Sequence, residues 1–206
     1  MSLAKKADTQ ISEDEYLQGE IMSEIKHEYI AGNVYAMAVA SATHNLISGN
    51  VFRELSINLK QKNSPCDIFS SDMKVKVSRN STSFFYPDVM IVCDTNNEDE
   101  YYQNFPVIIV EVLSKSTRKN DKKLKKLAYF NIPTLSEYVI IEQDYCEVEV
   151  FRKNQHWQSD NYFLGDEITF ESIDTTISVE DIYYHVKNED MLNFLEERRK
   201  SMEKGK

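Results

Sequence analysis

The most informative part of the hydrophobic pattern is a pair of short, β-branched apolar runs that each contain one acid. Asp88 lies within residues 86–92, and Glu111 lies within residues 107–114. Such runs predict strands of a buried sheet, because a strand covered on both faces is apolar almost throughout. A carboxylate in such a strand costs free energy unless its charge is compensated. Either each acid ends its strand against solvent or a backbone N–H group, or the two acids share a bound cation.

The pattern around these two runs predicts amphipathic helices and half-buried strands. Ser12 followed by Glu15 is typical of a capping box, and the apolar residues between 41 and 62 recur at helical spacing. Helices are expected at residues 11–17, 41–62, 118–130, 178–184 and 189–204. Further strands are expected in a hairpin over residues 24–37 that turns at 31–33, and at residues 67–77, 137–142 and 146–152.

These elements predict an α/β (mixed α+β) fold, in which a central mixed β-sheet is flanked by helices and carries an N-terminal hairpin and an antiparallel extension. A helix joins residues 107–114 to residues 137–142, and strands joined in this way are usually parallel. The short link after residue 142 predicts an antiparallel neighbour instead. The apolar stripe of the joining helix is expected to face the sheet; it consists of Leu124, Leu127, Ala128 and Asn131.

Length and composition fit one globular domain over residues 1–206, with residues 1–10 and 200–206 frayed. No apolar run approaches the roughly 18 residues of a membrane span, so a soluble, cytoplasmic protein without a membrane partner is expected. Cys66, Cys93 and Cys146 are odd in number and lack CxxC spacing. They are expected to be reduced, and neither a disulfide framework nor a zinc site is indicated.

Charge is distributed unevenly along the chain. The formal net charge is −10, yet residues 115–126 contain seven basic residues and one acid. A positive segment that follows two acidic strands suits a polyanion such as nucleic acid. Asp121, Lys125 and Tyr129 are spaced four apart and so share one flank of the predicted helix.

The motifs, taken in order, resemble the Uma-type family of restriction endonucleases in the PD-(D/E)XK superfamily. They are Tyr-Pro-Asp-Val from residue 86, Val-Glu-Val-Leu-Ser-x-Ser-Thr from residue 110, Asp-x-x-x-Lys-x-x-x-Tyr from residue 121, and Glu-Tyr-x-x-x-Glu from residue 137. The resemblance covers the chain from about residue 15 to 179. It implies a restriction-endonuclease-like fold and an Mg²⁺-dependent (or Mn²⁺-dependent) endonuclease, a hydrolase that cuts phosphodiester bonds of nucleic acid, with DNA as the first expectation.

The resemblance also implies roles for individual residues. Asp88 and Glu111 correspond to the catalytic acids that bind metal. Glu28 is a candidate third carboxylate, although its place before a hairpin turn equally fits a surface residue. The superfamily lysine two residues after the second acid is Leu113 here, so Lys125 is the expected substitute.

Several residues receive weaker or purely electrostatic roles. His44 is interpreted as a packing or capping residue and Asp72 as a structural acid. A homodimer is expected, because enzymes of this superfamily that cut both strands often work in pairs. Four lysines are expected to bind backbone phosphates without reading sequence: Lys115, Lys119, Lys122 and Lys123.

The sequence alone leaves two other functions open. The chain could be a catalytically inactive nucleic-acid-binding or protein-interaction domain that retains the nuclease fold, and the net charge of −10 favours this class. It could also be a metal-dependent hydrolase of another phosphate ester, because a fold does not fix a substrate. The presence of Asp88, Glu111 and Lys125 together favours the endonuclease.

Overall fold

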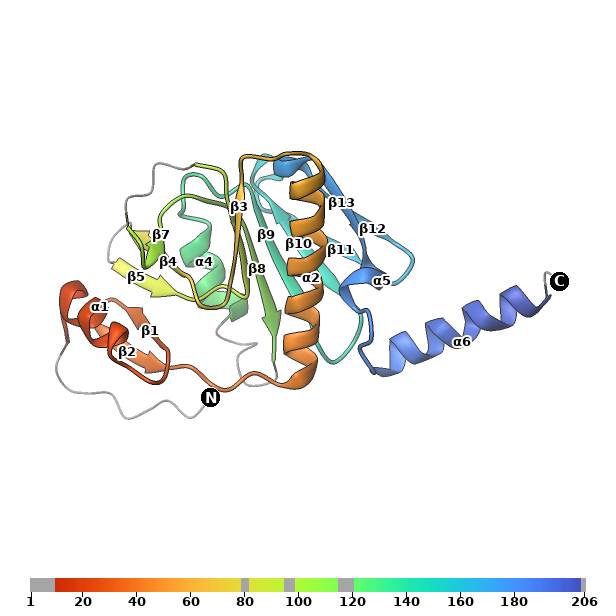
Figure 1. Cartoon of the computed structure of the whole chain (residues 1–206), viewed down its shortest axis with the longest axis horizontal. Coiled ribbons are helices and arrows are strands. Elements are labelled where there is room, and N and C mark those ends of the chain that lie inside the picture. Colours follow the sequence, from red (N-terminus) through yellow and green to blue (C-terminus); the bar gives the residue numbers. More distant parts are fainter. Residues whose placement is uncertain (1–9, 79–81, 95–98, 115–120, 205–206) are drawn as a thin grey trace.

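Two β-sheets form most of the protein, whose computed structural model describes residues 10–78, 82–94, 99–114 and 121–204 (Figure 1). The larger sheet has six strands in the order β11-β10-β9-β8-β6-β3. Strand β8 (Pro106–Leu113) pairs antiparallel with β6 (Val89–Val92) and parallel with β9 (Glu137–Glu142). The mixed sheet is therefore confirmed. Its other strands are β3 (Asp67–Ser70), β10 (Val148–Arg152) and β11 (Ser159–Tyr162).

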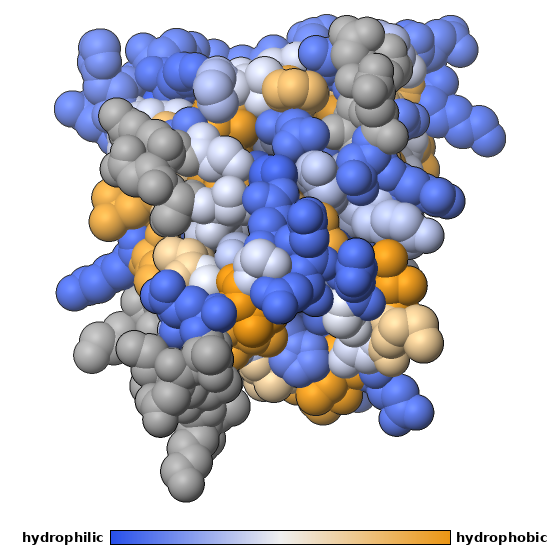
Figure 2. Space-filling view, turned by 90° about the vertical axis from the view of Figure 1, so that its left-hand side faces the viewer, coloured by the Kyte–Doolittle hydropathy of each residue, from blue (hydrophilic) through white to orange (hydrophobic). Residues whose placement is uncertain are grey.

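The second sheet contains the N-terminal hairpin and was not expected as a separate unit. Its order is β2-β1-β5-β4-β7, with β1 (His27–Ile30), β2 (Asn33–Ala36), β4 (Lys74–Ser78), β5 (Thr82–Phe85) and β7 (Tyr102–Gln103). The hairpin turns at Gly32, whose φ of +87° favours glycine. Helix α1 (Glu13–Ile21) begins with the expected capping box and packs Tyr16 on Tyr29. The surface at this end is mainly hydrophilic, with separate apolar patches (Figure 2).

Helix α2 (Ala42–Gln61) covers one face of the six-stranded sheet (Figure 1). Ser41 caps this helix, since its hydroxyl accepts a hydrogen bond from the His44 backbone N–H at 3.1 Å. The buried side of α2 carries Ile47, Val51, Leu55 and Leu59, which pack against apolar residues of β6 and β8. This packing fixes the first turn of α2 close to the ends of those two strands.

The opposite face of the sheet is covered by a short helix and by the second sheet. A wide π-helical turn, Asp121–Lys125, leads into α4 (Lys126–Tyr129). Tyr129 is fully buried in a cluster that also contains Phe85 from β5 and Tyr138 from β9. Trp157 lies flat on Phe130, with ring centroids 4.1 Å apart, and packs against the same cluster.

The C-terminal part adds a hairpin and two helices. Strands β12 (Glu167–Phe170) and β13 (Thr175–Ser178) precede α5 (Val179–Ile182) and α6 (Glu189–Lys204). Helix α6 includes residues 200–204 of the tail that was expected to fray, and an ion pair between Lys200 and Glu196 at 2.7 Å lies in this part of the helix. Residues 1–9, 205 and 206 lie outside the described ranges. None of the described helices is both long and apolar enough to cross a membrane.

The prediction of one continuous strand over residues 67–77 is wrong. Strand β3 pairs with β6 in the larger sheet, whereas β4 pairs with β5 in the smaller one. Between them the chain turns, and the Met73 N–H donates to the Ser70 carbonyl at 3.0 Å. Ser70, Ser71 and Asp72 are three polar residues in a row, so they interrupt the alternation and are the sequence signal of this turn.

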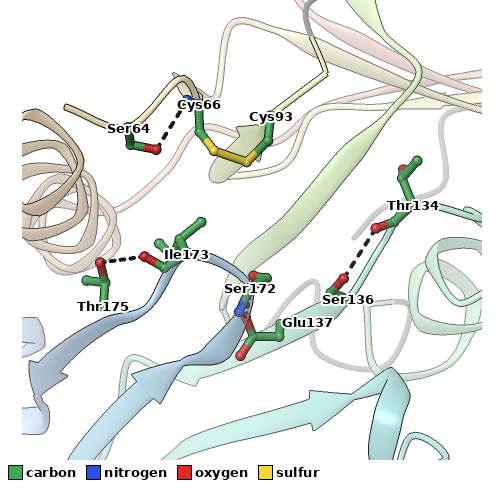
Figure 3. Close-up of a disulfide and its surroundings, with 9 residues drawn as sticks. All are labelled: Ser64, Cys66, Cys93, Thr134, Ser136, Glu137, Ser172, Ile173 and Thr175. Atoms are coloured by element: carbon green, nitrogen blue, oxygen red, sulfur yellow. Dashed lines mark hydrogen bonds between the residues drawn. A yellow bond between two sulfur atoms is a disulfide. The ribbon is translucent and has the colours of Figure 1, made fainter. Parts of the chain in front are cut away.

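The prediction of three reduced cysteines is also wrong. Cys66 and Cys93 form a disulfide that links the start of β3 to the end of β6 (Figure 3). Asp67 pairs with Val92 in the antiparallel register, so the residues just outside that pair lie opposite one another. The bond thus follows from the register of two strands that are not neighbours in sequence. Cys146 is the buried free cysteine.

Candidate active site

The two acids of the apolar runs are brought together where β6 begins and β8 nears its end, within the larger sheet. Val89 of β6 pairs with Val110 of β8, and the antiparallel register extended by one residue places Asp88 opposite Glu111. Residues directly opposite each other in such a pair point to the same side of the sheet, with Cβ atoms about 5 Å apart. Two carboxylates from different strands therefore share one site.

Asp88 is held by two hydrogen-bonding groups. Its Oδ2 atom accepts a hydrogen bond from the Val112 backbone N–H at 2.7 Å. The same oxygen lies 3.2 Å from Nε2 of His44, in the first turn of α2. The sequence suggested a packing role for His44, because a lone histidine near a helix start carries little information. Only the packing of α2 on the sheet brings it to Asp88.

Lys125 links the second acid to a third one from the other sheet. Its ammonium nitrogen lies 2.7 Å from Oε1 of Glu28 and 3.3 Å from Oε1 of Glu111. All three residues are buried, with exposed fractions of 8%, 7% and 3% for Lys125, Glu28 and Glu111. Buried carboxylates need a cationic partner of this kind. Transfer of an ion from water into a protein interior costs on the order of several kcal/mol. Glu28 is thus part of the cluster and not a hairpin surface residue.

Tyr129 completes the surroundings of Glu111. Its hydroxyl donates to Oε1 of Glu111 at 2.7 Å. Burial, and then the charge of Glu111, raise the pKa of Tyr129 well above its ordinary value, so the hydroxyl keeps its proton and remains a donor. One oxygen of Glu111 therefore receives both a neutral donor and an ammonium.

The expected orientation of the joining helix is reversed. Leu124 and Leu127 were predicted to face the sheet but are 44% and 67% exposed, while Lys125 and Tyr129 point inward. The ion pairs of Lys125 and the hydrogen bond of Tyr129 compensate for their burial, and the ring of Tyr129 fills the core beside Phe85. Hydrophobic periodicity depends only on where the apolar residues lie, so it does not reveal the polar groups that pair with Lys125 and Tyr129. The side chain of Asp121 lies outside the described part.

A pocket of about 870 Å³ opens onto the cluster. Glu28, His44, Asp88, Glu111 and Lys125 line its interior. Its lining also includes the exposed apolar side chains of Ile25, Val39 and Leu124, among polar residues. The pocket therefore combines buried charged groups with exposed apolar ones.

The donor set of this pocket fits a hard divalent cation. Asp88 and Glu111 offer carboxylate oxygens, which Mg²⁺ and Mn²⁺ prefer. Among the described residues, no group of three or more His, Cys, Asp or Glu side chains is arranged to hold a metal ion. Mg²⁺ does not require one, because it often binds only one or two carboxylates and completes its shell with water and phosphate oxygens.

Comparison with known proteins assigns the chain to a family. The model of the Uma2 family, described as "Putative restriction endonuclease", matches residues 13–179. The chain belongs to the Uma2 family. The matched region contains the five ionisable residues named above, Glu28, His44, Asp88, Glu111 and Lys125, and the family description supports a nuclease-like function.

Two relatives and one solved structure extend this assignment. An uncharacterized Synechocystis protein, slr1290, is 32% identical over 176 residues, covering 84% of this chain and 91% of that protein. A second one, sll1609, is 38% identical over 143 residues, or 68% and 78% of the two chains. The crystal structure of "a putative nuclease belonging to DUF820" from Anabaena variabilis superposes with a TM-score of 0.66 at 18% identity, covering 84% of this chain and 97% of that one. This last likeness confirms the fold.

The four predicted phosphate-binding lysines of this Uma2 protein and Asp72 lie in different environments. Lys115 and Lys119 lie outside the described residues, whereas Lys123 is exposed. Lys122 pairs with the buried Glu142 at 3.0 Å. Burial lowers the pKa of Lys122, but the hydrogen bond and charge of Glu142 outweigh it, so the pKa is raised and the ion pair is maintained. Asp72 is exposed and does not line the pocket, although it pairs with Lys26, which does.

Proposed function

We propose that this Uma2 protein is an Mg²⁺-dependent endonuclease, active also with Mn²⁺, that hydrolyses phosphodiester bonds of DNA. One observation carries the proposal: Asp88 and Glu111 face each other across two strands, and the Lys125 ammonium is held beside them. Two carboxylates that face each other repel, so a binding module would have little reason to keep the pair. A cation-dependent phosphodiesterase needs this arrangement.

The roles of the residues follow from their contacts. Asp88 and Glu111 would hold Mg²⁺, which supplies Lewis acidity and lowers the pKa of water. The Val112 N–H and His44 fix one oxygen of Asp88, so its other oxygen is oriented for binding. Glu28 and Glu111 place the Lys125 ammonium in the pocket, where it would stabilise the charge that develops on the scissile phosphate. Glu28 acts in this proposal by positioning Lys125.

Cleavage assays on the purified protein test the proposal. Supercoiled duplex DNA, single-stranded DNA and RNA are each incubated with Mg²⁺, with Mn²⁺ and with chelator. We expect nicking or linearisation of DNA with either metal and none with chelator. Absence of cleavage under every condition, together with retained DNA binding, would favour the inactive binding domain, which the net charge of −10 also fits.

Replacing His44 with alanine should weaken Mg²⁺ binding about 10- to 100-fold, the usual effect of losing a group that orients a metal-binding side chain. The measurement is the metal concentration at half-maximal shift of the melting temperature. Asn45→Ala is the matched control, because Asn45 is the next residue of α2 and also lines the pocket. If this metal concentration is the same for both variants and wild type, His44 is only a packing residue.

Replacing Lys123 with alanine should lower the slope of log affinity against log salt by about one unit, as expected for one lost phosphate contact. Lys122→Ala should change the slope less, because the Lys122 ammonium is already paired with Glu142. Binding of a catalytically blocked protein to duplex DNA at several salt concentrations gives both slopes. If neither substitution changes the slope, the DNA backbone lies away from this helix.

The partner proposed for the protein itself is a second copy. A duplex presents two strands, whereas each chain carries one carboxylate pair of this kind within its described part. Two copies related by a two-fold axis would supply two pockets, one for each strand. We therefore propose a homodimer.

A further inference from the structure

Helix α6 leaves the body of the protein after its first turn (Figure 1). That turn is anchored, because Met191 is buried and Asp190 accepts a hydrogen bond from the Cys146 N–H at 2.8 Å. Beyond it the side chains of the described helix are exposed or only partly buried. An isolated helix of this length is marginal in water, since most helices owe their stability to the packing of an apolar face.

The projecting part of α6 has such a face. Leu192, Leu195 and Met202 are 55%, 48% and 61% exposed. Their spacing of three and seven residues places them on one side of the helix, with Met191 and Phe194 at its margins. A stripe of this width normally packs against another helix. The described part of the same chain leaves this stripe exposed.

The distribution of charge along α6 indicates that the helix packed against it is the α6 of a second copy. Residues 189–197 contain four acids and no basic residue, whereas residues 198–204 contain four basic residues and one acid. When two copies of α6 lie antiparallel, the acidic half of each faces the basic half of the other. A parallel arrangement opposes like charges at both ends. The charge order also suits the helix dipole, but the dipole does not explain the exposed apolar stripe.

We propose that α6 is a dimerisation arm that binds the α6 of a second copy in antiparallel orientation. Leu192, Leu195 and Met202 form the apolar contact, and the two charge halves select the orientation. The contact is isologous, because the same face serves in both copies, so it closes at two chains. The proposal does not depend on nuclease activity.

Sedimentation and light scattering of the whole protein test the apolar contact. Wild type should be a dimer at high micromolar concentration, and Leu195→Glu should be a monomer with an unchanged melting profile of the body. Asn193→Glu adds the same charge on the opposite side of α6 and should stay dimeric. A monomeric wild type, or a Leu195→Glu variant that still dimerises, would overturn the proposal, as would an α6 that binds DNA or anionic vesicles without self-association.

Charge reversal tests the pairing of the two halves. One variant carries Glu196→Lys with Glu197→Lys, and the other carries Arg198→Glu with Arg199→Glu. Each alone should dimerise about tenfold or more weakly than wild type, because like charges now meet across the contact. An equimolar mixture should recover dimers, although neither helix has changed. Failure of the mixture to recover them would contradict the pairing.

Orientation follows from the salt dependence of wild type. An antiparallel contact joins opposite charges, so the dimer should weaken as salt rises. A parallel contact joins like charges, and its dimer would strengthen with salt. The sign of this change therefore decides between the two orientations, and a dimer that strengthens with salt would refute the antiparallel arm.

Discussion

Replacing Lys125 with alanine should lower the rate of DNA cleavage by about a hundredfold or more, the typical loss when one preorganised donor to a developing charge is removed. The ammonium lies in the pocket between Glu28 and Glu111, where little water screens it. Single-turnover cleavage at saturating metal gives the rate, and equilibrium binding to uncleaved DNA should be nearly unchanged. Unaltered cleavage would mean that the metal alone stabilises the charge on the phosphate.

The same substitution should also change the response to metal. Without Lys125, two buried carboxylates lack their counter-ion, which costs about 3–5 kcal/mol for a buried pair that loses one partner. Mg²⁺ offsets the same charge, so it should raise the melting temperature of Lys125→Ala more than that of wild type. Lys126→Ala is the control. Its ammonium lies 3.6 Å from the centroid of the Phe151 ring, so its loss should affect packing slightly and cleavage hardly at all.

Replacing Asp88 with asparagine should abolish most metal-induced stabilisation and lower cleavage by about a thousandfold or more, because bound metal supplies several kcal/mol of transition-state stabilisation. Asparagine keeps the shape of the side chain but removes the charge that balances the cation. Glu111→Gln should have the same effect on metal binding, since the register of β6 and β8, extended by one residue, places the two acids opposite each other. Calorimetric titration with Mg²⁺ and single-turnover cleavage give the two quantities.

An acid outside the pocket provides the matched control for this pair. Asp72 is exposed and pairs with Lys26, so Asp72→Asn should retain both metal binding and cleavage. If Asp88→Asn and Glu111→Gln bind Mg²⁺ as wild type does, the two carboxylates do not form a metal site. If Asp72→Asn also loses metal binding and cleavage, those losses reflect a general effect of removing negative charge and not an effect on this site.

Much of the local structure could be predicted because its causes are local. The capping box of Ser12 and Glu15, the hairpin turn at Gly32 and the apolar face of α2 each depend on residues within one or two turns of the chain. The positions of Asp88 and Glu111 in or beside buried strands followed from their apolar neighbours. That the two strands are adjacent came from the family resemblance and is confirmed by the register of β6 and β8.

The face that Lys125 and Tyr129 present to the core could not be predicted in the same way. Hydrophobic periodicity assigned the interior to Leu124 and Leu127, whereas the interior holds the residues with specific polar partners. Those partners, Glu28 and Glu111, come from two different sheets. Whether a lysine can be buried depends on groups that are distant in sequence, so the pattern within one helix does not contain the answer.

The sequence by itself therefore determined most of the helices, the mixed character of the larger sheet and the acids on which the site is built, because each of these depends on the order of neighbouring residues. Tertiary structure alone decided the split of residues 67–77 between two sheets, the Cys66–Cys93 disulfide and the approach of His44 to Asp88. Each of these arises from strand register or from the docking of a helix. Register and docking join segments far apart in the chain, and only the packed molecule brings those segments together.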